Sequence, residues 1–518
     1  MSRNPEKHST AAESDSLLES QVRPRQWENP KPADRYHLVV IGGGPAGLVA
    51  AAAAAGLGAK VALVERKFLG GDCLNTGCVP SKALISAART AALVRRAREF
   101  GVRLPEDPVV DFTAVMERMR QLRARLSSND SAHRFREMGV DVFFGQGRFL
   151  NGSQVEVGGA KLTFRRAVIA TGSRAVAPAI PSLDSIDHLN HESLFSLTQL
   201  PRRLAVIGAG PIGCEMAQAF QQFGSQVTLL ESAPGILTRE DRDAAAIVQN
   251  AIEHDGVRVR CNVRELAIAT QHEGAEHGAA QHGDGVLIRG VSQSQSWEAV
   301  ADRILVAAGR AANVEGLGLD SADVAYGSKG IQVNDRLQTT NPRIYAAGDV
   351  CSAFPFTHAA DAMARVVIQN ALFWGRKRAS ALLIPWCTYT TPELAHVGLS
   401  QAVAESRGVG IDVYQEHFAE CDRAVLDGEE AGFVRVLCRR GTDQILGVTI
   451  VGANAGDLIG EASLAMKYRL GLSKFSGAIH PYPTRADILR KLGDQYQRTK
   501  LTPWVRSLLQ WRFGSRRG

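Results

Sequence analysis

One sequence pattern occurs twice in this chain and limits its fold more than any other feature. Residues 37–47 read HLVVIGGGPAG and residues 203–213 read RLAVIGAGPIG. Each is an apolar run that enters a G-x-G-x-x-G turn and continues into a helix-forming stretch. A second apolar run then ends in an acid at the same spacing, Glu65 in the first unit and Glu231 in the second. Two complete units predict two dinucleotide-binding α/β domains.

The glycines of each turn have separate physical tasks. The first permits the sharp turn from strand to helix, the second lets the backbone approach a pyrophosphate, and the third lets helix and strand pack closely. They are Gly42, Gly44 and Gly47 in the first unit, with Pro45 and Ala46 between them, and Gly208, Gly210 and Gly213 in the second. The helix N-terminus would face the phosphates. The acid would accept hydrogen bonds from the adenosine ribose.

The acid of the second unit also bears on which nicotinamide dinucleotide binds. A carboxylate at Glu231 suits the free 2′-hydroxyl of NADH and repels the 2′-phosphate of NADPH. Arg239 and Arg242 follow it and could reach such a phosphate. NADH is therefore favoured, and NADPH stays an alternative.

Length and composition are those of a multidomain globular protein. The chain has 518 residues, of which 45% are hydrophobic and 22% charged. No apolar run approaches the roughly 20 residues that cross a bilayer. The net charge is +7, but no nucleic-acid motif accompanies it, so we expect no nucleic-acid partner. Residues 1–34 are polar and lack the apolar core of a signal peptide, which predicts a flexible arm and a cytoplasmic protein.

Two of the eight cysteines stand in a special context. Residues 70–85 read GGDCLNTGCVPSKALI, which places Cys73 and Cys78 at the start of a helix-forming run. A thiolate is stabilised near a helix N-terminus. No second Cys or His pair stands nearby, which argues against zinc. The other six cysteines are scattered singly and are expected to be small buried side chains.

The segment GGDCLNTGCVPSK resembles the active-site signature of the class I pyridine nucleotide–disulfide oxidoreductases. That family includes glutathione reductase, dihydrolipoamide dehydrogenase and mercuric reductase. The resemblance runs in colinear order from His37 to Asp494, through ATG at 170–172, AAGR at 307–310 and IYAAGDV at 344–350. It implies a homodimeric enzyme that passes electrons from NAD(P)H, through FAD, to a Cys73–Cys78 disulfide and on to an acceptor.

The resemblance also implies an α/β fold with three domains. The FAD domain would be split in sequence around an inserted NAD(P) domain, and an α+β dimerisation domain would follow. The expected bounds are 35–175 and 305–380 for FAD, 176–304 for NAD(P), and 381–494 for dimerisation, with an arm at 1–34 and a basic tail at 495–518.

Residue roles follow from the same resemblance. Cys78 would lie against the flavin as the charge-transfer thiolate, and Cys73 would be the interchange thiol that meets the acceptor. Lys82 would sit near flavin N5 and pair with Glu215. Further cofactor contacts are implied for Gly71, Ala170, Thr171, Gly172, Gly309 and Gly348, for Asp349 at the ribityl chain, for His358 and Ala359 at the flavin N1 side, and for Arg310 in the nicotinamide cleft.

The segment AIHPYPTRADILR at 478–490 departs from the disulfide reductases. Those enzymes have a His–Glu acid/base pair where this chain has Tyr482 and Asp487. A tyrosine, with a reference pKa of about 10, is a poor base at neutral pH. His480 is an alternative base or ligand. Asp72, where relatives usually have Thr, is expected to disfavour a thiolate at its neighbour Cys73.

Tyrosine at this position resembles mercuric reductase, although the chain has no cysteine after Cys438. No resident metal site is predicted, but an acceptor such as Hg(II) or Cu(II) would meet Cys73 and Cys78. The leading hypothesis is therefore reduction of a metal ion or small electrophile. A disulfide reductase or dihydrolipoamide dehydrogenase-like enzyme is the alternative.

A hypothesis of another class concerns the C-terminal tail. The sequence LTPWVRSLLQWRFGSRRG combines apolar residues, two tryptophans and arginines behind a Thr502–Pro503 helix start. Such a helix can lie on an anionic membrane surface or pack on the protein's own dimer. The flavoprotein would then act mainly as a partner-binding or membrane-associated module.

Overall fold

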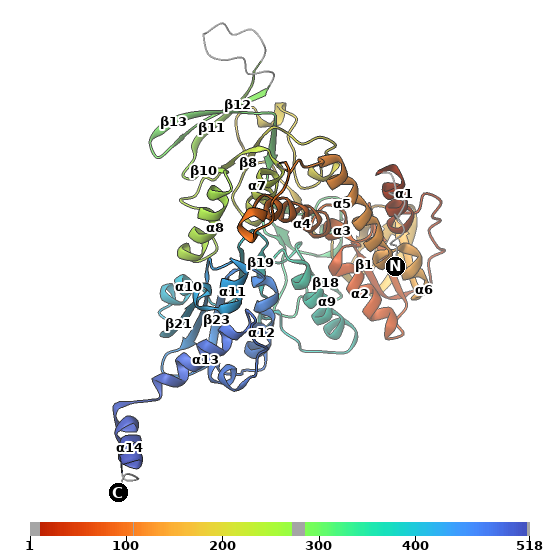
Figure 1. Cartoon of the computed structure of the whole chain (residues 1–518). Coiled ribbons are helices and arrows are strands. Elements are labelled where there is room, and N and C mark those ends of the chain that lie inside the picture. Colours follow the sequence, from red (N-terminus) through yellow and green to blue (C-terminus); the bar gives the residue numbers. More distant parts are fainter. Residues whose placement is uncertain (1–10, 107, 272–284, 515–518) are drawn as a thin grey trace, which may run out of the picture.

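The computed structural model describes residues 11–106, 108–271 and 285–514. Its elements form two dinucleotide-binding domains and a C-terminal domain (Figure 1). The predicted α/β class is confirmed.

The first domain is built on a sheet with strand order β3-β2-β1-β6-β5-β4, in which β18 also pairs with β6. The strands are β1 (Tyr36–Ile41), β2 (Val61–Glu65), β3 (Val140–Phe144), β4 (Arg148–Asn151), β5 (Gln154–Val157), β6 (Ala160–Ile169) and β18 (Ile344–Ala346). The central strands β1, β2, β3, β6 and β18 run parallel. Every residue of β2 is buried, as expected for a parallel strand covered on both faces.

Helices cover this sheet and carry the cysteine segment. They are α1 (Ala11–Val22), α2 (Pro45–Gly56), α3 (Gly71–Asn75), α4 (Cys78–Arg95), α5 (Phe112–Leu126), α6 (Ala132–Glu137) and α9 (Thr357–Leu372). Helix α2 starts directly after the first glycine turn, so its N-terminus faces the carboxyl ends of the parallel strands. Ligands of such sheets bind at that edge.

The second domain repeats the pattern with strand order β10-β9-β8-β14. Its elements are β8 (Arg203–Ile207), α7 (Pro211–Phe223), β9 (Gln226–Leu230), α8 (Arg242–His254), β10 (Arg258–Arg260), β11 (Arg264–Gln271), β12 (Gly285–Ser292), β13 (Gln295–Ala301) and β14 (Arg303–Val306). Because β14 still pairs with β8, the return to the first domain begins at 307 rather than at the expected 305. The chain passes between the first and second domains twice. The two connecting segments contain β7 (Ser173–Ala175) and β15 (Arg310–Ala312), which pair antiparallel.

The third domain contains an antiparallel sheet with strand order β19-β20-β23-β22-β21. Its strands are β19 (Trp386–Thr388), β20 (Glu393–Gly398), β21 (Ile411–His417), β22 (Phe433–Arg439) and β23 (Ile445–Gly452). Its helices are α10 (Gln401–Ser406), α11 (Asp422–Asp427), α12 (Ala455–Lys467) and α13 (Asp487–Thr499). A small hairpin of β16 (Tyr326–Gly327) and β17 (Gly330–Ile331) belongs to the chain between the second and third domains.

The expected flexible arm is wrong for residues 11–34, whereas residues 1–10 lie outside the described part. Helix α1 packs beside α5 and α6 (Figure 1). Leu18 and Val22 are buried in the core of the first domain, and Trp27 packs against that core. The segment is ordered because Leu18, Val22 and Trp27 all reach the apolar core of the first domain.

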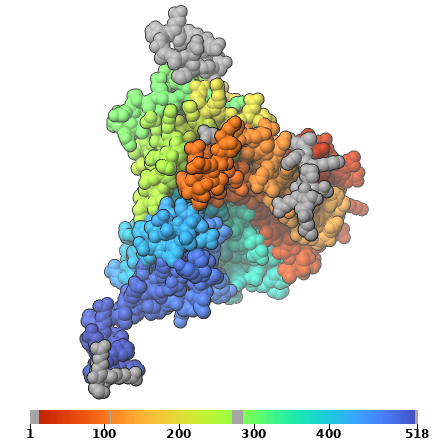
Figure 2. Space-filling model, in the orientation of Figure 1, coloured from red at the N-terminus to blue at the C-terminus, as the bar shows by residue number. Residues whose placement is uncertain are grey.

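The expected tail helix is present as α14 (Pro503–Gly514). It stands away from the body of the chain beyond α13 (Figures 1 and 2). Trp504, Trp511 and Phe513 are 73%, 72% and 64% exposed. Residues 515–518 of the tail lie outside the described part.

Candidate active site

Both glycine turns have the geometry that the sequence predicts. Gly42 and Gly208 have φ of +109° and +101°, a region that side chains disfavour. A Cβ on Gly47 would lie 1.8 Å from the Gly42 carbonyl oxygen, and the same distance separates a Cβ on Gly213 from the Gly208 oxygen. Only glycine allows the helix to start this close to the strand.

The acid of each unit braces its own turn. Glu65 accepts hydrogen bonds of 2.6 Å from the backbone N–H groups of Gly43 and Lys67. Glu231 accepts them from Ala209 and Ala233 at 2.8 and 2.9 Å. The carboxylates are thereby held at the carboxyl ends of β2 and β9, where an adenosine ribose would meet them.

The first domain fits FAD, the cofactor that the sequence leads us to expect. A Cβ on Gly42 would lie 2.2 Å from the Ala170 oxygen, and one on Gly71 would lie 2.7 Å from the Gly44 Cα, so the pyrophosphate cradle tolerates no side chains there. Thr171 donates to the Asn313 carbonyl at 2.7 Å and ties the ATG segment to the returning chain. Gly348, with φ +81°, turns the chain into Asp349.

Helix α9 begins beside the cysteines and positions the remaining predicted cofactor residues. His358 lies in its first turn with Nε2 2.6 Å from the Pro385 carbonyl oxygen, and Ala359 follows as a buried residue. Thr357, which the sequence reasoning missed, is the first residue of α9, and its Oγ1 is 3.6 Å from the Sγ of Cys78. The only feature of the sequence that could have pointed to Thr357 is its position directly before His358.

The two cysteines have unequal acidities. Both are free thiols, Cys73 in α3 and Cys78 at the first position of α4. A hydrogen bond from Cys73 is the main factor that lowers the pKa of Cys78 to about 6, and Thr357 and Lys82 add to it. The same pairing raises the pKa of Cys73, and burial raises it further. These contacts favour Cys78 over Cys73 as the thiolate, and the role implied for Cys78 stays a prediction.

The implied contact between Lys82 and Glu215 is present. The Lys82 Nζ is 2.8 Å from Glu215, whose side chain is 4% exposed. The other Glu215 oxygen accepts from the backbone N–H of Tyr389 at 2.9 Å. The Tyr389 ring, which the sequence reasoning missed, lies 4.5 Å from Nζ in a cation–π contact. A cavity of about 390 Å³ opens beside Lys82 and Tyr389.

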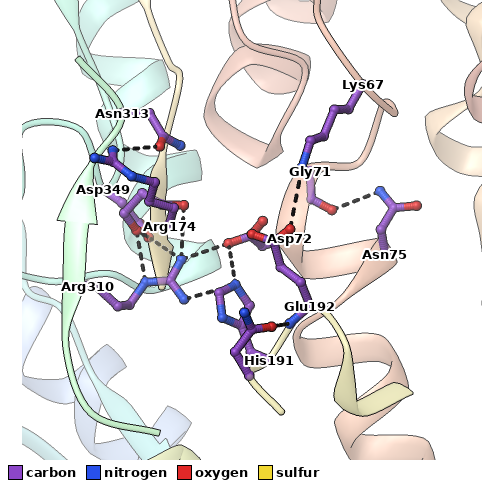
Figure 3. Close-up of polar contacts among 12 residues, drawn as sticks. Lys67, Gly71, Asp72, Asn75, Arg174, His191, Glu192, Arg310, Asn313 and Asp349 are labelled. Atoms are coloured by element: carbon purple, nitrogen blue, oxygen red, sulfur yellow. Dashed lines mark hydrogen bonds and ion pairs between the residues drawn. The ribbon is translucent and has the colours of Figure 1, made fainter. Parts of the chain in front are cut away.

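Arg310 contacts residues of the FAD domain, and its place in the nicotinamide cleft stays a prediction. Its guanidinium donates to Asp72 at 2.7 Å and to the Ser173 hydroxyl at 2.9 Å, and it lies 3.8 Å from Asp349 (Figure 3). Ser173 in turn donates to Asp349 at 2.8 Å. Arg310 thus lies between two carboxylates of the FAD domain, because β15 places it opposite β7.

Asp72 does not act on Cys73 in the way that its position in the sequence predicts. Its carboxylate turns to Arg310 and to His191, whose Nε2 is 3.3 Å away (Figure 3). Burial acts to raise the pKa of Asp72, but His191 and Arg310 outweigh it and hold that pKa below the ordinary value. His191, 9% exposed and 119 residues away in sequence, was not predicted.

The C-terminal segment lacks a base in the expected place. Tyr482 is 76% exposed and donates to Asp422 at 2.7 Å, which raises its pKa. Asp487 is bound by Arg490 at 2.7 Å, which lowers its pKa. The two residues therefore have separate partners and form no acid/base pair within the chain.

The side chain of His480, the alternative base, is buried. Its side chain is 8% exposed, and its Nε2 lies 3.1 Å from Glu461. Its Nδ1 is buried without a partner among the described residues. The expectation that His480 serves as the base is not supported by this burial.

Neither a metal cluster nor a membrane-spanning helix occurs among the described residues. There, no group of three or more His, Cys, Asp or Glu side chains is arranged to hold a metal ion. Among the helices described, none combines the length and apolar character that crossing a bilayer demands.

Comparisons with known proteins agree with this geometry. Residues 36–365 match the family described as "Pyridine nucleotide-disulphide oxidoreductase", and residues 384–492 match its dimerisation domain. A dihydrolipoyl dehydrogenase of Thermus scotoductus is 34% identical over 460 residues, which is 89% of this chain and 97% of that protein. A mercuric reductase of Streptomyces lividans is 32% identical over 461 residues, covering 88% and 95%.

Solved structures give the same result. The Cu(II) complex of the HOCl-induced flavoprotein disulfide reductase RclA from Escherichia coli superposes with a TM-score of 0.77 and 27% identity. That match covers 89% of this chain and all of the other.

Proposed function

Because this chain belongs to the pyridine nucleotide–disulfide oxidoreductase family, we propose that it is an NADH-dependent reductase of a thiol-binding metal ion, Hg(II) or Cu(II). The family is FAD-dependent and uses a pyridine nucleotide, and its dimerisation domain is present, so the working unit is a homodimer. The acceptor, the preference for NADH and the residue roles are the parts that we propose.

FAD, when bound, would supply the two-electron chemistry that connects the nicotinamide to the Cys73–Cys78 disulfide. Cys78 then carries the thiolate, because its pKa is about 6. Cys73 keeps its proton until an acceptor displaces it, because its own pKa is raised. Lys82 keeps a positive charge beside the thiolate, and the buried Glu215 holds Lys82 in place.

The observation that carries this proposal is the absence of a His–Glu base at Tyr482 and Asp487. A disulfide substrate needs a proton for its leaving thiol, and general acid catalysis is worth about 10²–10⁴-fold. A metal ion bound by two thiolates needs no such proton, and soft ions select thiolate ligands. Tyr482 with its raised pKa would serve the first reaction poorly and does not hinder the second.

The electrons and atoms balance for either ion. NADH loses a hydride to become NAD⁺, and this supplies two electrons and leaves one proton in solution. One Hg(II) takes both electrons and becomes Hg(0), or two Cu(II) ions take one each and become Cu(I). The mercuric reductase relatives and the Cu(II) complex of RclA support a metal-ion acceptor.

The test is anaerobic oxidation of NADH with Hg(II) in excess small thiol, or with Cu(II) in a buffer free of thiol, because a thiol would itself reduce Cu(II). We expect turnover by the wild type and its loss in Cys73→Ala and Cys78→Ala. Cys261→Ser is the matched control, because Cys261 is a partly buried free thiol of the second domain. Metal-dependent turnover that persists in Cys73→Ala would sink the proposal.

The second candidate acceptor is a small disulfide. The dihydrolipoyl dehydrogenase of Thermus scotoductus, at 34% identity, is the observation that favours it. Turnover of lipoamide at a kcat above that with either metal ion would replace the metal proposal by this one.

The preference for NADH is supported by how the second domain uses its charges. Glu231 presents a carboxylate at the end of β9. The Arg242 guanidinium donates to the Ile236 and Glu240 carbonyls, and the Arg239 guanidinium to the Ala353 carbonyl. Both arginines are therefore engaged with backbone carbonyls, which leaves the carboxylate to select a free ribose hydroxyl.

A proposal about location concerns the tail. Residues 495–518 contain six Lys or Arg and no Asp or Glu. Trp504, Leu508 and Trp511 share one face of α14 at helical spacing and are all exposed. An acid-free basic helix with exposed tryptophans fits an anionic lipid surface. We place the enzyme in the cytoplasm, where its eight free cysteines stay reduced, with the tail on the membrane.

Pelleting with vesicles of phosphatidylcholine, with and without phosphatidylglycerol, tests the tail. Only the anionic vesicles should pellet the wild type, and truncation after Asp494 or the pair Trp504→Ala and Trp511→Ala should abolish it. A mass change of the dimer upon truncation, without any pelleting of the wild type, would instead assign the tail to the protein's own dimer.

A further inference from the structure

The N-terminal segment that includes α1 lies before the residues that match the family. The family match begins at residue 36, whereas residues 11–30, here called the N-terminal strap, are ordered before it. Val22 is fully buried, and Trp27 lies in edge contact with the rings of His133 and Phe144. The strap is therefore a fixed part of the first domain.

One end of the strap holds the segment that follows β2. Arg23 donates to the carbonyls of Arg66 and Lys67 at 2.6 and 3.0 Å. The Val22 carbonyl accepts from the backbone N–H of Leu69 at 3.2 Å. These contacts hold Arg66, Lys67 and Leu69 in the segment that leads from Glu65 to α3, which carries Cys73.

The other end of the strap holds the end of β3. Trp27 donates through Nε1 to the Val142 carbonyl at 3.1 Å. The Asn29 amide donates to the Phe144 carbonyl at 2.9 Å and accepts from the Phe144 N–H at 2.8 Å. Asn29 thus satisfies both backbone groups of the last residue of β3, as a neighbouring strand would.

The two held segments border the adenosine end of the FAD site. They follow adjacent parallel strands at the carboxyl edge of the sheet, where dinucleotides bind. Glu65, which would meet the ribose, is the last residue of β2, and its carbonyl accepts from the Gly145 N–H directly beyond Phe144. The strap therefore bridges two segments beside the expected adenosine site.

The strap is also anchored to the helix that carries Cys73. Asp15 pairs with Arg123 at 2.8 Å, and Arg123 donates to the Asn75 carbonyl of α3 at 3.0 Å. Arg123 is 13% exposed in its side chain, so this link is shielded from solvent. The strap thus contacts the segment after Glu65 directly and reaches α3 through Arg123.

We infer that the N-terminal strap retains FAD by fastening the two segments at the adenosine end of its site. The ligand is the adenosine half of a flavin dinucleotide, and the residues that act on it through the backbone are Arg23, Trp27 and Asn29. They are positioning residues, because their partners are the backbone groups beside the cofactor.

The test measures FAD release from the purified holoenzyme, with the released flavin separated by ultrafiltration and read by fluorescence. Asn29→Ala and Arg23→Ala should each release FAD about fivefold faster, because each loses hydrogen bonds worth about 1 kcal/mol. Arg25→Ala is the matched control, since Arg25 is 82% exposed and pairs only with Glu19 on the surface.

The measured rate of FAD release depends on no electron acceptor, so the result is independent of the metal-ion proposal. Variants that fold and dimerise as the wild type does but release FAD at the wild-type rate would overturn the inference. So would equal acceleration in Arg25→Ala, or a lower thermal stability of the apoprotein with unchanged release.

Discussion

The Nζ of Lys82 lies 2.8 Å from Glu215, and this ion pair joins α4 of the first domain to α7 of the second. Tyr389, at the edge of the third domain, donates its backbone N–H to the same carboxylate. A carboxylate that is 4% exposed needs such partners. Three domains therefore meet at the buried Glu215 carboxylate. Its partner Lys82 lies four residues along α4 from Cys78.

Removing Lys82 and removing Glu215 should shift the pKa of Cys78 in opposite directions. The Lys82 ammonium lowers that pKa and the Glu215 carboxylate raises it. Lys82→Met should therefore raise the pKa of Cys78, and Glu215→Gln should lower it. The measurement is the rate of Cys78 alkylation against pH in the reduced enzyme, with the site identified by peptide mass. Shifts of the same sign in both variants would contradict the assignment.

Cys73 should control the acidity of Cys78 more strongly than any charge does. Its hydrogen bond is the largest factor that brings the pKa of Cys78 to about 6. The wild-type thiolate should exist above about pH 6 and be lost below it, and its long-wavelength absorbance beside oxidised flavin should follow. In Cys73→Ala the midpoint should move to higher pH. Cys261→Ala should leave it in place.

Arg310 should contribute to stability as the cation between Asp72 and Asp349. Burial raises the pKa of Asp349, so the loss of the cation leaves two carboxylates poorly compensated. Arg310→Met should lower the free energy of unfolding by about 1–2 kcal/mol, as measured in urea. Arg289→Met, which breaks the exposed pair with Glu298, should cost about 0–1 kcal/mol.

The double variant Arg310→Met with Asp72→Ala sharpens this prediction. If the two side chains act together, the combined loss should be smaller than the sum of the single losses. Additive losses would show that Arg310 acts without Asp72.

The sequence predicted those parts of the site whose backbone geometry demands one residue type. Gly42 and Gly208 need positive φ, and Gly47 and Gly213 need a missing Cβ, so the pattern carries the structure directly. The pairing of Lys82 with Glu215 came from a resemblance and is present. Contacts such as Arg310 with Asp72 join residues 238 positions apart and could not be read from local pattern.

The N-terminal strap escaped prediction for a different reason. Helix α1 reads AAESDSLLESQV, and only Leu18 and Val22 of its large apolar side chains are buried. The order of the strap depends on contacts with α5, with β3 and with the segment after β2, which a largely polar sequence does not reveal. His480 likewise looked available in sequence, but the fold buries it against Glu461.

Glu231 should determine the choice of dinucleotide. Glu231→Gln keeps an oxygen for the turn but removes the charge that favours a ribose diol. We expect the KM for NADH to rise about tenfold, the scale of a lost charged hydrogen bond, and the ratio of NADH to NADPH efficiency to fall. Glu253→Gln makes the same charge change on an exposed turn of α8 and should leave both values unaltered. An unchanged ratio in Glu231→Gln would remove the argument for NADH.

Restoring the missing base should convert the acceptor preference. In the family's dimer, Tyr482 and Asp487 of one subunit would face Cys73 of the other. Tyr482→His with Asp487→Glu recreates the His–Glu pair of the disulfide reductases. Lipoamide turnover should rise at least about tenfold, because a positioned general acid typically contributes 10²–10⁴-fold. Metal-dependent NADH oxidation should change little, because the thiolates of Cys73 and Cys78 bind the metal ion without this base.

The single variants serve as the controls for this gain. Tyr482→Phe removes the hydroxyl that binds Asp422 without adding a base, so it should not gain lipoamide turnover. Asp487→Glu alone should not gain it either, because Arg490 already engages that carboxylate. If the double variant stays as poor with lipoamide as the wild type while retaining FAD and metal-dependent turnover, the missing base is not what limits disulfide substrates.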